Sequence, residues 1–592
     1  MKNNANNFQG NIHTVNYKER YETKICDNSS LIQIDGRAKD SLNGDYNFTV
    51  DPYDSCLRAD WYKEKKENSE NHMEIPLDYN FENYPTHSVP SCWNMEDKQL
   101  YLYSDTGLYY RTFKYKNRGE EKVFLHLEGA MYRCYVFLNN EYVALHDGGS
   151  TPFSLDITSY IKDGYNKLLF AVDTQRKSYR VPMENTDWFN YGGLYRDISL
   201  IRTPKVFIQD YVVTLKKDTN FSKIQLGVTL NEKVNQKVTL KISELNIDAE
   251  FDAIDGKVDA IIDAKPELWS IENPKLYEVS LSTEKDSVTD KIGFREIKVD
   301  GLKILLNGNE IYLKGISVHE DHVTLGKTIS DEEIRATIKM HKEMNGNFMR
   351  LAHYPHTRRF AQIADEMGML LWEEIPVYWA IDFANPVTQK DAQNQMSELI
   401  KRDINRASVI IWSVGNENPD TDDRLSFMRT LADLSHQLDP TRLVSAACLV
   451  NTVEMKLEDR LMDSLDIIGN NEYYGWYEPN FKDLLTIINN TKLDKPVIIT
   501  EFGAGAKAGL HGPKEQMWTE EFQEELYKKQ FETIGKCKFI RGTTPWIFID
   551  FRAVRRQNKY QEGFNRKGLI AEDRVTKKLA YYVTQKHYKN IK

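Results

Sequence analysis

The sequence predicts a multidomain fold: a β jelly-roll sandwich, an immunoglobulin-like β-sandwich and a C-terminal (β/α)8 TIM barrel. Length is the first observation, because 592 residues are too many for one ordinary hydrophobic core. The second is that short strand-like runs, separated by turn residues, fill the first half of the chain. The third is a change after about residue 300, where apolar strands begin to alternate with amphipathic helices.

Residues 1–203 have the pattern of a jelly-roll domain. Apolar runs alternate there with Gly, Asn and Asp turns, and Asn139-Asn140 between two such runs signals a hairpin. Many short strands at this spacing are typical of a β-sandwich of the jelly-roll type. The strand candidates are residues 108–115, 122–129, 135–146 and 167–174.

A second and shorter series of strand-like runs occupies residues 204–298. Its size and pattern fit a seven-stranded immunoglobulin-like sandwich. The stretch PELWSIENPKLYEV (266–279) has prolines on both sides of Trp269, which is typical of a sheet edge.

Residues 299–592 carry eight apolar strand candidates separated by helical stretches, the count expected of a (β/α)8 barrel. The first helical stretch opens with Ser330 and Glu333, a capping box. A doubly wound sheet is the alternative, but no glycine-rich phosphate loop follows the first strand. The strand candidates are residues 312–317, 347–352, 369–374, 408–417, 443–447, 466–471, 496–502 and 540–546.

Composition limits the partners and the compartment. A net charge of −10 argues against a nucleic acid or a membrane surface as partner. We expect neither a signal peptide nor a transmembrane span, because the N-terminus lacks an apolar segment and no run of 18 apolar residues occurs. Six scattered cysteines without CxxC spacing predict reduced thiols in a cytoplasmic protein, with no zinc site.

Two glutamates stand at the ends of buried strands. Glu417 ends the fourth barrel strand in SVIIWSVGNE, and Glu501 ends the seventh in PVIITEF. The C-terminal ends of barrel strands form the active sites of such folds, and strands four and seven face each other across the opening. A glutamate is more often a surface ion-pair partner, but two so placed predict the acid/base and nucleophile of a retaining glycosidase.

WSVGNE and ITEFG, behind a jelly roll and an immunoglobulin-like domain, resemble the family 2 glycoside hydrolases. HDGGSTPFSLDIT (146–158), KGISVHED and MRLAHYPH extend the resemblance over nearly the whole chain. It implies that Glu501 is the nucleophile, Glu417 the acid/base and Asn416 the asparagine paired with it. It also implies double displacement with no cofactor. Some gut relatives bind a flavin away from the active site, and the sequence does not decide that point.

Within the family the likeness is closest to bacterial β-glucuronidases. NEYYGWY (471–477), MWTEEFQ (517–523) and FNRKGL (564–569) carry it. The last contains Asn565 and Lys567, which resemble the Asn-x-Lys motif that holds the C6 carboxylate of the sugar. An ammonium and an amide are suitable partners, because a sugar acid must exchange its hydration for charge-assisted hydrogen bonds.

The resemblance implies further substrate-binding residues. Asp187 corresponds to the acid that the jelly roll sends over the barrel to the sugar hydroxyls, and Arg350 to a charge beneath the nucleophile. The remaining wall of the sugar pocket is expected from His319, Asn471, Tyr473, Tyr477 and Trp546. Trp546 as barrel core and Arg350 as a structural ion-pair partner are the alternatives. A zinc site at His319 and His322 is disfavoured because HExxH spacing is absent.

The chain departs from the family pattern in two places. Gln561 stands where the best-known glucuronidases have an arginine before the Asn-x-Lys motif; Arg552, Arg555 and Arg556 are candidates to replace it. The connection from Glu374 to the helix near Gln393 is short, so we expect an open site without a long lid there.

Other functions remain as alternatives. The same machinery could serve a β-galacturonide or a β-galactoside; Lys567 disfavours a neutral sugar, because a buried ammonium without an anion is costly. A non-catalytic carbohydrate-binding protein is the alternative from another class, disfavoured by retention of both glutamates. The expected substrates are small-molecule or oligosaccharide β-glucuronides. The resemblance implies a homo-oligomer, with a tetramer favoured, and leaves the preferred leaving group (aglycone) undefined.

Overall fold

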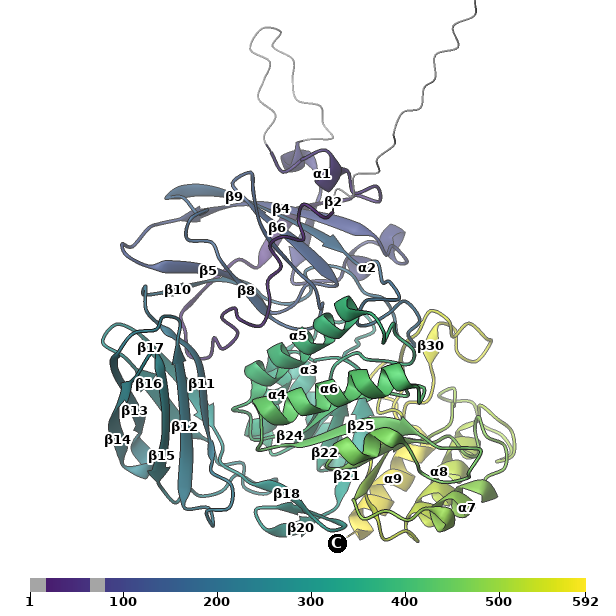
Figure 1. Cartoon of the computed structure of the whole chain (residues 1–592). Coiled ribbons are helices and arrows are strands. Elements are labelled where there is room, and N and C mark those ends of the chain that lie inside the picture. Colours follow the sequence, from purple (N-terminus) through teal and green to yellow (C-terminus); the bar gives the residue numbers. More distant parts are fainter. Residues whose placement is uncertain (1–17, 64–79, 592) are drawn as a thin grey trace, which may run out of the picture.

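The computed structural model describes residues 18–63 and 80–591. The jelly roll lies at the top of Figure 1, the immunoglobulin-like domain at lower left and the barrel at lower right. The predicted fold class is confirmed. The expectation of no signal peptide concerns the N-terminal stretch of the chain, and most of that stretch lies outside the described residues.

The jelly roll consists of two antiparallel sheets packed around an aromatic-rich core that includes Trp93 and Tyr109. Asn139 and Asn140 both adopt positive φ angles (52° and 70°) between β6 and β7, so the predicted hairpin forms there. The six-stranded sheet has the order β3 (Thr86–Val89), β2 (Gly44–Val50), β4 (Thr106–Tyr115), β9 (Gly164–Asp173), β6 (Arg133–Leu138) and β7 (Glu141–His146). The four-stranded sheet has the order β1 (Lys39–Ser41), β10 (Ile198–Thr203), β5 (Lys122–Leu127) and β8 (Phe153–Asp156). Short helices α1 (Ser55–Arg58) and α2 (Trp93–Glu96) flank them.

The immunoglobulin-like domain has seven strands in two sheets, as predicted. Buried and less buried residues alternate strictly along β12, the pattern of a strand with one face in the core. One sheet contains β11 (Ile208–Leu215), β12 (Lys223–Leu230) and β15 (Lys257–Asp263). The other contains β14 (Ile247–Ala253), β13 (Gln236–Ile242), β16 (Tyr277–Ser282) and β17 (Ser287–Ile292).

The third domain is a closed barrel of eight parallel strands, and each strand candidate coincides with one of them. The strands are β21 (Leu313–Val318), β22 (Phe348–Leu351), β23 (Leu370–Glu374), β24 (Val409–Asn416), β25 (Leu443–Leu449), β26 (Ile468–Asn471), β27 (Val497–Glu501) and β28 (Ile540–Thr543). A small sheet, β18 (Ile297–Asp300), β19 (Lys303–Leu306) and β20 (Asn309–Ile311), packs on apolar residues at the N-terminal ends of these strands.

Helices cover the outside of the barrel. Half of the capping box at Ser330 forms: its hydroxyl accepts a hydrogen bond from the backbone N–H of Glu333, while the Glu333 carboxylate pairs with Arg574 (2.9 Å). Between β25 and β26 only a short 3-10 helix, η5 (Arg460–Ser464), stands where the barrel pattern calls for an α-helix. The α-helices are α3 (Asp331–Glu343), α4 (Arg358–Met367), α5 (Pro386–Asp403), α6 (Asp422–Leu438), α7 (Lys482–Asn490), α8 (Glu520–Ile534) and α9 (Leu579–Asn590).

Two long connections reach the mouth of the barrel. Residues 174–197, between β9 and β10, leave the jelly roll and dock on the barrel, where Arg196 pairs with Glu320 (2.8 Å). Residues 544–578 connect β28 to α9 and include β29 (Phe551–Arg552) and β30 (Phe564–Asn565). Both bring side chains from distant parts of the sequence to one end of the barrel. Among the described helices, none is both long and apolar enough to cross a membrane.

Candidate active site

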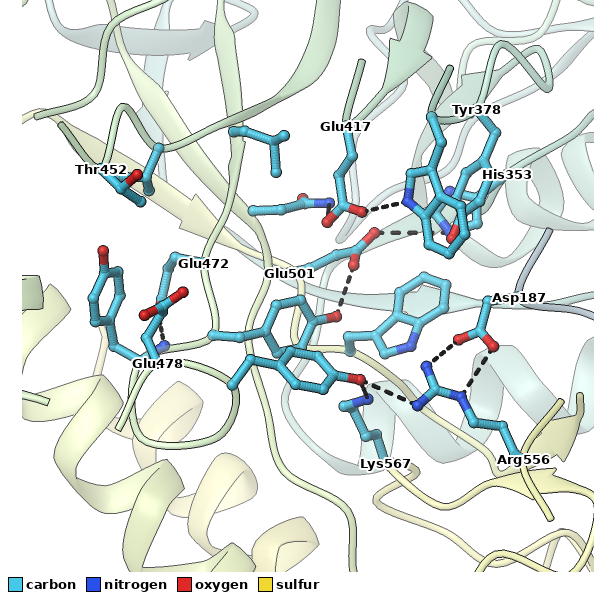
Figure 2. Close-up of a pocket in the computed structure, with 18 residues that line it drawn as sticks. Asp187, His353, Tyr378, Glu417, Thr452, Glu472, Glu478, Glu501, Arg556 and Lys567 are labelled. Carbon is cyan, nitrogen blue, oxygen red and sulfur yellow. Dashed lines mark hydrogen bonds and ion pairs between the residues drawn. The ribbon is translucent and has the colours of Figure 1, made fainter. Parts of the chain in front are cut away.

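A cavity of about 400 Å³ opens at the C-terminal ends of the barrel strands, and both Glu417 and Glu501 line it. Its size is within the range of small-molecule sites. Glu501 is the last residue of β27, and Glu417 directly follows β24. The two strands are separated by β25 and β26 on one side, so the side chains approach each other across the barrel mouth (Figure 2).

Glu501 is held by one cation and one hydroxyl. Arg350 Nη1 donates a hydrogen bond to its Oε1 (2.7 Å), and the Tyr473 hydroxyl donates to its Oε2 (2.7 Å). Only 4% of Glu501 is exposed. The two contacts fix the orientation of the carboxyl group, which suits a nucleophile.

Arg350 is itself fixed from beneath. It is fully buried on β22 and its Nη2 donates to Glu374 Oε1 (3.0 Å) and to Asn416 Oδ1 (2.7 Å). His353 Nδ1 also lies 3.0 Å from Glu374 Oε1. Although burial raises it, Arg350 and His353 together bring the pKa of Glu374 down to about 2. Glu374 therefore stays ionised and balances the guanidinium, which keeps Arg350 under Glu501.

Glu417 has a different environment, with neutral donors. Asn471 Nδ2 donates to its Oε1 (2.9 Å) and Trp379 Nε1 to its Oε2 (2.8 Å). Burial, together with the negative charge of Glu501, raises the pKa of Glu417 to about 7. A carboxyl that is still protonated near neutral pH can act as a general acid.

The opposite wall carries positive charge. Lys567 is 3% exposed, and its Nζ donates to the Tyr477 hydroxyl (2.7 Å). Among the described residues no carboxylate lies within ion-pair distance of this ammonium. Arg556 Nη1 donates to the same Tyr477 hydroxyl (3.2 Å). Although burial raises it, these two cations lower the pKa of Tyr477 below its usual value.

Asp187 comes from the jelly-roll connection and lines the cavity. Arg556 Nε donates to its Oδ1 (3.0 Å) and Asn565 Nδ2 to its Oδ2 (3.2 Å). Figure 2 shows Asp187, Arg556 and Lys567 together on one side of the glutamate pair. The jelly roll thus completes a site that the barrel alone would leave open.

The predicted site residues fall into two groups. The structure brings Asp187, Asn471, Tyr473, Tyr477, Trp546 and Lys567 to the cavity wall together with both glutamates. Arg350, Asn416, Asn565 and His319 lie behind that wall and contact residues that form it. Asn416 Oδ1 accepts hydrogen bonds from Arg350 and Asn471, while its Nδ2 has no partner among the described residues.

The three arginines that are candidates to replace the family arginine differ in where they lie. Arg556 lines the cavity. Arg552 does not; its Nη1 donates a hydrogen bond to the backbone carbonyl of His322. Gln561 is 6% exposed and accepts a hydrogen bond from Asn558. Of the three arginines that the sequence offered, Arg556 is the one placed beside Lys567.

Several wall residues were not predicted. His353, Tyr378 and Trp379 line the cavity, and Trp379 contacts Glu417 directly. The connection after β23, residues 375–385, is short as expected, yet it carries both Tyr378 and Trp379 to the site. The aromatic pair in the sequence PVYWA was the available signal.

The histidines of the HEDH stretch have other partners than a metal. His319 Nδ1 lies 3.0 Å from the Tyr354 hydroxyl, and His322 Nδ1 accepts from the backbone N–H of Thr324 (3.2 Å). Within residues 18–63 and 80–591, no group of three or more His, Cys, Asp and Glu side chains is arranged to hold a metal ion.

Barrel, cavity and glutamate pair define a glycoside hydrolase. Three family models match along the chain: the family 2 sugar binding domain over residues 39–204, glycosyl hydrolases family 2 over 206–295, and the family 2 TIM barrel domain over 297–592. The chain belongs to the family 2 glycosyl hydrolases.

Proteins similar to this chain are named as β-glucuronidases. A β-glucuronidase of Paenibacillus borealis is 28% identical over 598 residues, 91% of this chain and 95% of the relative. A putative β-glucuronidase of Formosa agariphila is 28% identical over 601 residues, 90% of this chain and 70% of the relative. A solved structure of the Ruminococcus gnavus β-glucuronidase in complex with D-glucuronic acid is similar with a TM-score of 0.82 and 26% identity, covering 95% of this chain and all of that one.

Proposed function

We propose that this enzyme hydrolyses terminal β-D-glucuronides with retention of configuration. The observation that carries the proposal is the buried ammonium of Lys567, which lines the cavity of the two glutamates and has no carboxylate partner among the described residues. A buried cation without an anion is costly, and the C6 carboxylate of a glucuronide would supply the anion. The named activity of the relatives supports the same substrate.

The first step forms a glycosyl-enzyme. A carboxylate oxygen of Glu501 attacks the anomeric carbon while Glu417 gives its proton to the glycosidic oxygen, so the leaving group departs as an alcohol or phenol. Arg350 and Tyr473 hold Glu501 ready for attack, and the raised pKa of Glu417 keeps the proton available near neutral pH.

The second step returns the enzyme to its starting state. Ester formation removes the negative charge of Glu501, and this charge is one cause of the raised pKa of Glu417. The pKa of Glu417 should therefore fall in the intermediate, which makes the side chain a base. Glu417 then takes a proton from water as the water oxygen attacks the anomeric carbon, Glu501 leaves as a carboxylate, and the product keeps the β configuration.

The carboxylate end would use more than Lys567. The Tyr477 hydroxyl lies within hydrogen-bond distance of both Lys567 and Arg556, and Asn565 accepts a hydrogen bond from the backbone N–H of Lys567 (3.2 Å). Arg556 also forms an ion pair with Asp187. We infer that Arg556 takes the place of the arginine that the family pattern has at Gln561, by contributing a second positive charge near C6.

A panel of matched aryl β-glycosides tests the proposal: glucuronide, galacturonide, galactoside, glucoside and mannoside. We expect the glucuronide to be cleaved with the highest kcat/KM. The galacturonide differs from the glucuronide only at C4. Preference for it would support the proposed carboxylate site but would show that the substrate is a galacturonide. Preference for a neutral sugar would contradict the role of Lys567. No turnover of any member would favour a non-catalytic carbohydrate-binding protein.

Three further points are proposals. Catalysis should need no cofactor, because two carboxyl groups and water supply the chemistry; full activity after dialysis, without flavin absorbance, would support this. We propose a cytoplasmic location, supported by six cysteines that are all free thiols. We also propose a homo-oligomer, a tetramer being favoured by resemblance to the family, and light scattering would measure its mass.

A further inference from the structure

The cavity has two chemically different ends. Asp187, Arg556 and Lys567 lie on one side of Glu417 and Glu501, while Thr452, Glu472 and Glu478 lie on the other (Figure 2). The first side receives the sugar if the proposed function holds, and the role that we infer for the second side rests on that proposed function. We call the second side the leaving-group arm; it is lined by Leu449, Val450, Thr452, Glu472, Tyr474 and Glu478.

The position of the general acid, Glu417, indicates that the leaving group points toward the arm. Glu417 must reach the glycosidic oxygen, so the leaving group lies beyond Glu417 on the side away from Lys567. The arm starts there, because Leu449 is the last residue of β25 and the backbone N–H of Glu417 donates to the carbonyl of Ala447 on the same strand (2.8 Å). The leaving group would therefore enter the arm.

The walls of the arm combine an apolar surface with carboxyl groups. Leu449 and Val450 supply apolar area, and Leu449 is 42% exposed. The acidic side chains among the described lining residues of the arm are Glu472 and Glu478, and the arm contains no lysine or arginine. The arm thus carries carboxyl groups, whereas the Lys567 end of the same cavity carries cations.

Glu472 is the most unusual of these residues. It is 4% exposed, and its Oε2 accepts hydrogen bonds from the backbone N–H of Tyr474 (3.0 Å) and from Gln530 Nε2 (3.1 Å). Its Oε1 is buried and has no hydrogen-bond partner among the described residues. Burial raises the pKa of this carboxyl to about 8. A buried polar atom without a partner is costly, and a rotation of the Glu472 side chain toward the arm would let a donor on a ligand remove that cost.

We propose that the leaving-group arm selects aglycones with an apolar body and a hydrogen-bond donor at the far end, an amine above all, and rejects those with an anionic group there. The apolar body would pack on Leu449 and Val450. The donor would meet the carboxyl groups of Glu472 and Glu478. An aglycone carboxylate would face two carboxyl groups without a cation.

Four phenyl β-glucuronides with different para substituents test this: aminomethyl, hydroxymethyl, ethyl and carboxymethyl. In each, a methylene separates the substituent from the ring, which limits the differences between the leaving-group pKa values, and comparing enzyme variants on the same substrates cancels what remains of them. We expect kcat/KM to fall in the order given, with on the order of 10-fold between aminomethyl and carboxymethyl, as attraction of the ammonium and repulsion of the carboxylate by modest contacts with the arm would produce. Equal kcat/KM for the aminomethyl and carboxymethyl substrates would overturn the proposal.

Two variants assign the effect to the arm. Glu478→Gln and Glu472→Gln should each reduce the aminomethyl-to-carboxymethyl ratio several-fold. Glu454→Gln is the matched control, because it removes the same charge from the exposed segment after Val450 but does not line the arm. A ratio that Glu454→Gln changes as much as Glu478→Gln would mean a general field of the surface and contradict the proposal. Equal losses on all four substrates in Glu472→Gln would mean a merely structural role for Glu472.

Failure of this inference is separable from failure of the proposed function. Cleavage of all four glucuronides at similar rates would refute the inference and leave the glucuronidase intact. If no glucuronide is cleaved but another sugar of the glycoside panel is, the proposed function fails. The same four leaving groups on that sugar then test the arm, with the same expected order.

Discussion

The ends of β24 and β27 carry the same residue type in opposite surroundings. At the end of β27, Glu501 is paired with the Arg350 guanidinium and the Tyr473 hydroxyl. At the end of β24, Glu417 accepts hydrogen bonds only from the neutral groups of Asn471 and Trp379 among the described side chains. One carboxyl is bound by a cation, and the other has a raised pKa and keeps its proton up to a pH of about 7. Two glutamates thus acquire two roles from their neighbours.

Removing the charged member should cause the largest loss. Glu501→Gln eliminates the nucleophile but preserves the shape of the side chain, so kcat should fall by several orders of magnitude on every substrate. Steady-state kinetics on an aryl glucuronide, with circular dichroism to verify folding, would measure it. Substantial activity in this variant, or a product of inverted configuration by NMR, would contradict the retaining mechanism.

Removing the neutral member should cause a loss that depends on the leaving group. Glu417→Ala should lower kcat/KM by about 10²–10⁴-fold for poor leaving groups, the usual contribution of general acid catalysis. Substrates with good leaving groups should form the glycosyl-enzyme at nearly normal rates, and azide should rescue turnover by giving a β-glycosyl azide. A uniform loss across leaving groups, without azide rescue, would mean that Glu417 is not the acid/base.

Weakening the support of Glu501 should have a smaller effect. Tyr473→Phe removes the hydroxyl that donates to Glu501 Oε2, and a hydrogen bond to a charged group contributes about 1.5–3 kcal/mol. We expect kcat/KM to fall by about 10–100-fold. Tyr582→Phe, on the exposed side of α9, is the control and should leave kinetics unchanged. An unchanged rate in Tyr473→Phe would remove Tyr473 from the mechanism.

The smallest effect concerns pH. Because burial and the charge of Glu501 raise the pKa of Glu417 to about 7, Glu417 is protonated below that pH and loses its proton above it. The activity should therefore decline as pH rises through about 7. The hydrogen bond from Trp379 lowers the pKa of Glu417, so Trp379→Phe should move this basic limb to higher pH. A limb that stays in place or moves to lower pH would contradict the assignment.

The barrel and its glutamate pair could be predicted from the sequence because both depend on local patterns. Runs such as VIIW and PVIIT are buried strands in any α/β fold, and the residue after a barrel strand lies at the mouth. The prediction that Tyr473 and Lys567 belong to the site rested on the resemblance to the family rather than on the pattern of the residues.

The features that the sequence did not predict come from loops and from side-chain direction. Trp379 reaches Glu417 because residues 375–385 fold back over the strand ends, which no periodicity encodes. His319 follows β21 but its ring packs against Phe551 and Trp546 behind the cavity wall. Arg556 was one of three arginines in DFRAVRR, and only the turn between β29 and β30 decides which of them reaches the Tyr477 hydroxyl beside Lys567.

The most direct test of the central claim is the sugar preference of Lys567→Ala. The measurement is kcat/KM for an aryl glucuronide and the matched aryl glucoside, in the wild type, in Lys567→Ala and in the control Lys559→Ala, which removes an exposed lysine from the same connection. We expect a wild-type ratio on the order of 10³ or more. Lys567→Ala should lower it by at least about 30-fold through loss of glucuronide activity alone, as expected when one partner of a buried charge pair is removed. A ratio that hardly changes would refute the uronidase assignment, even if the hydrolase assignment survives.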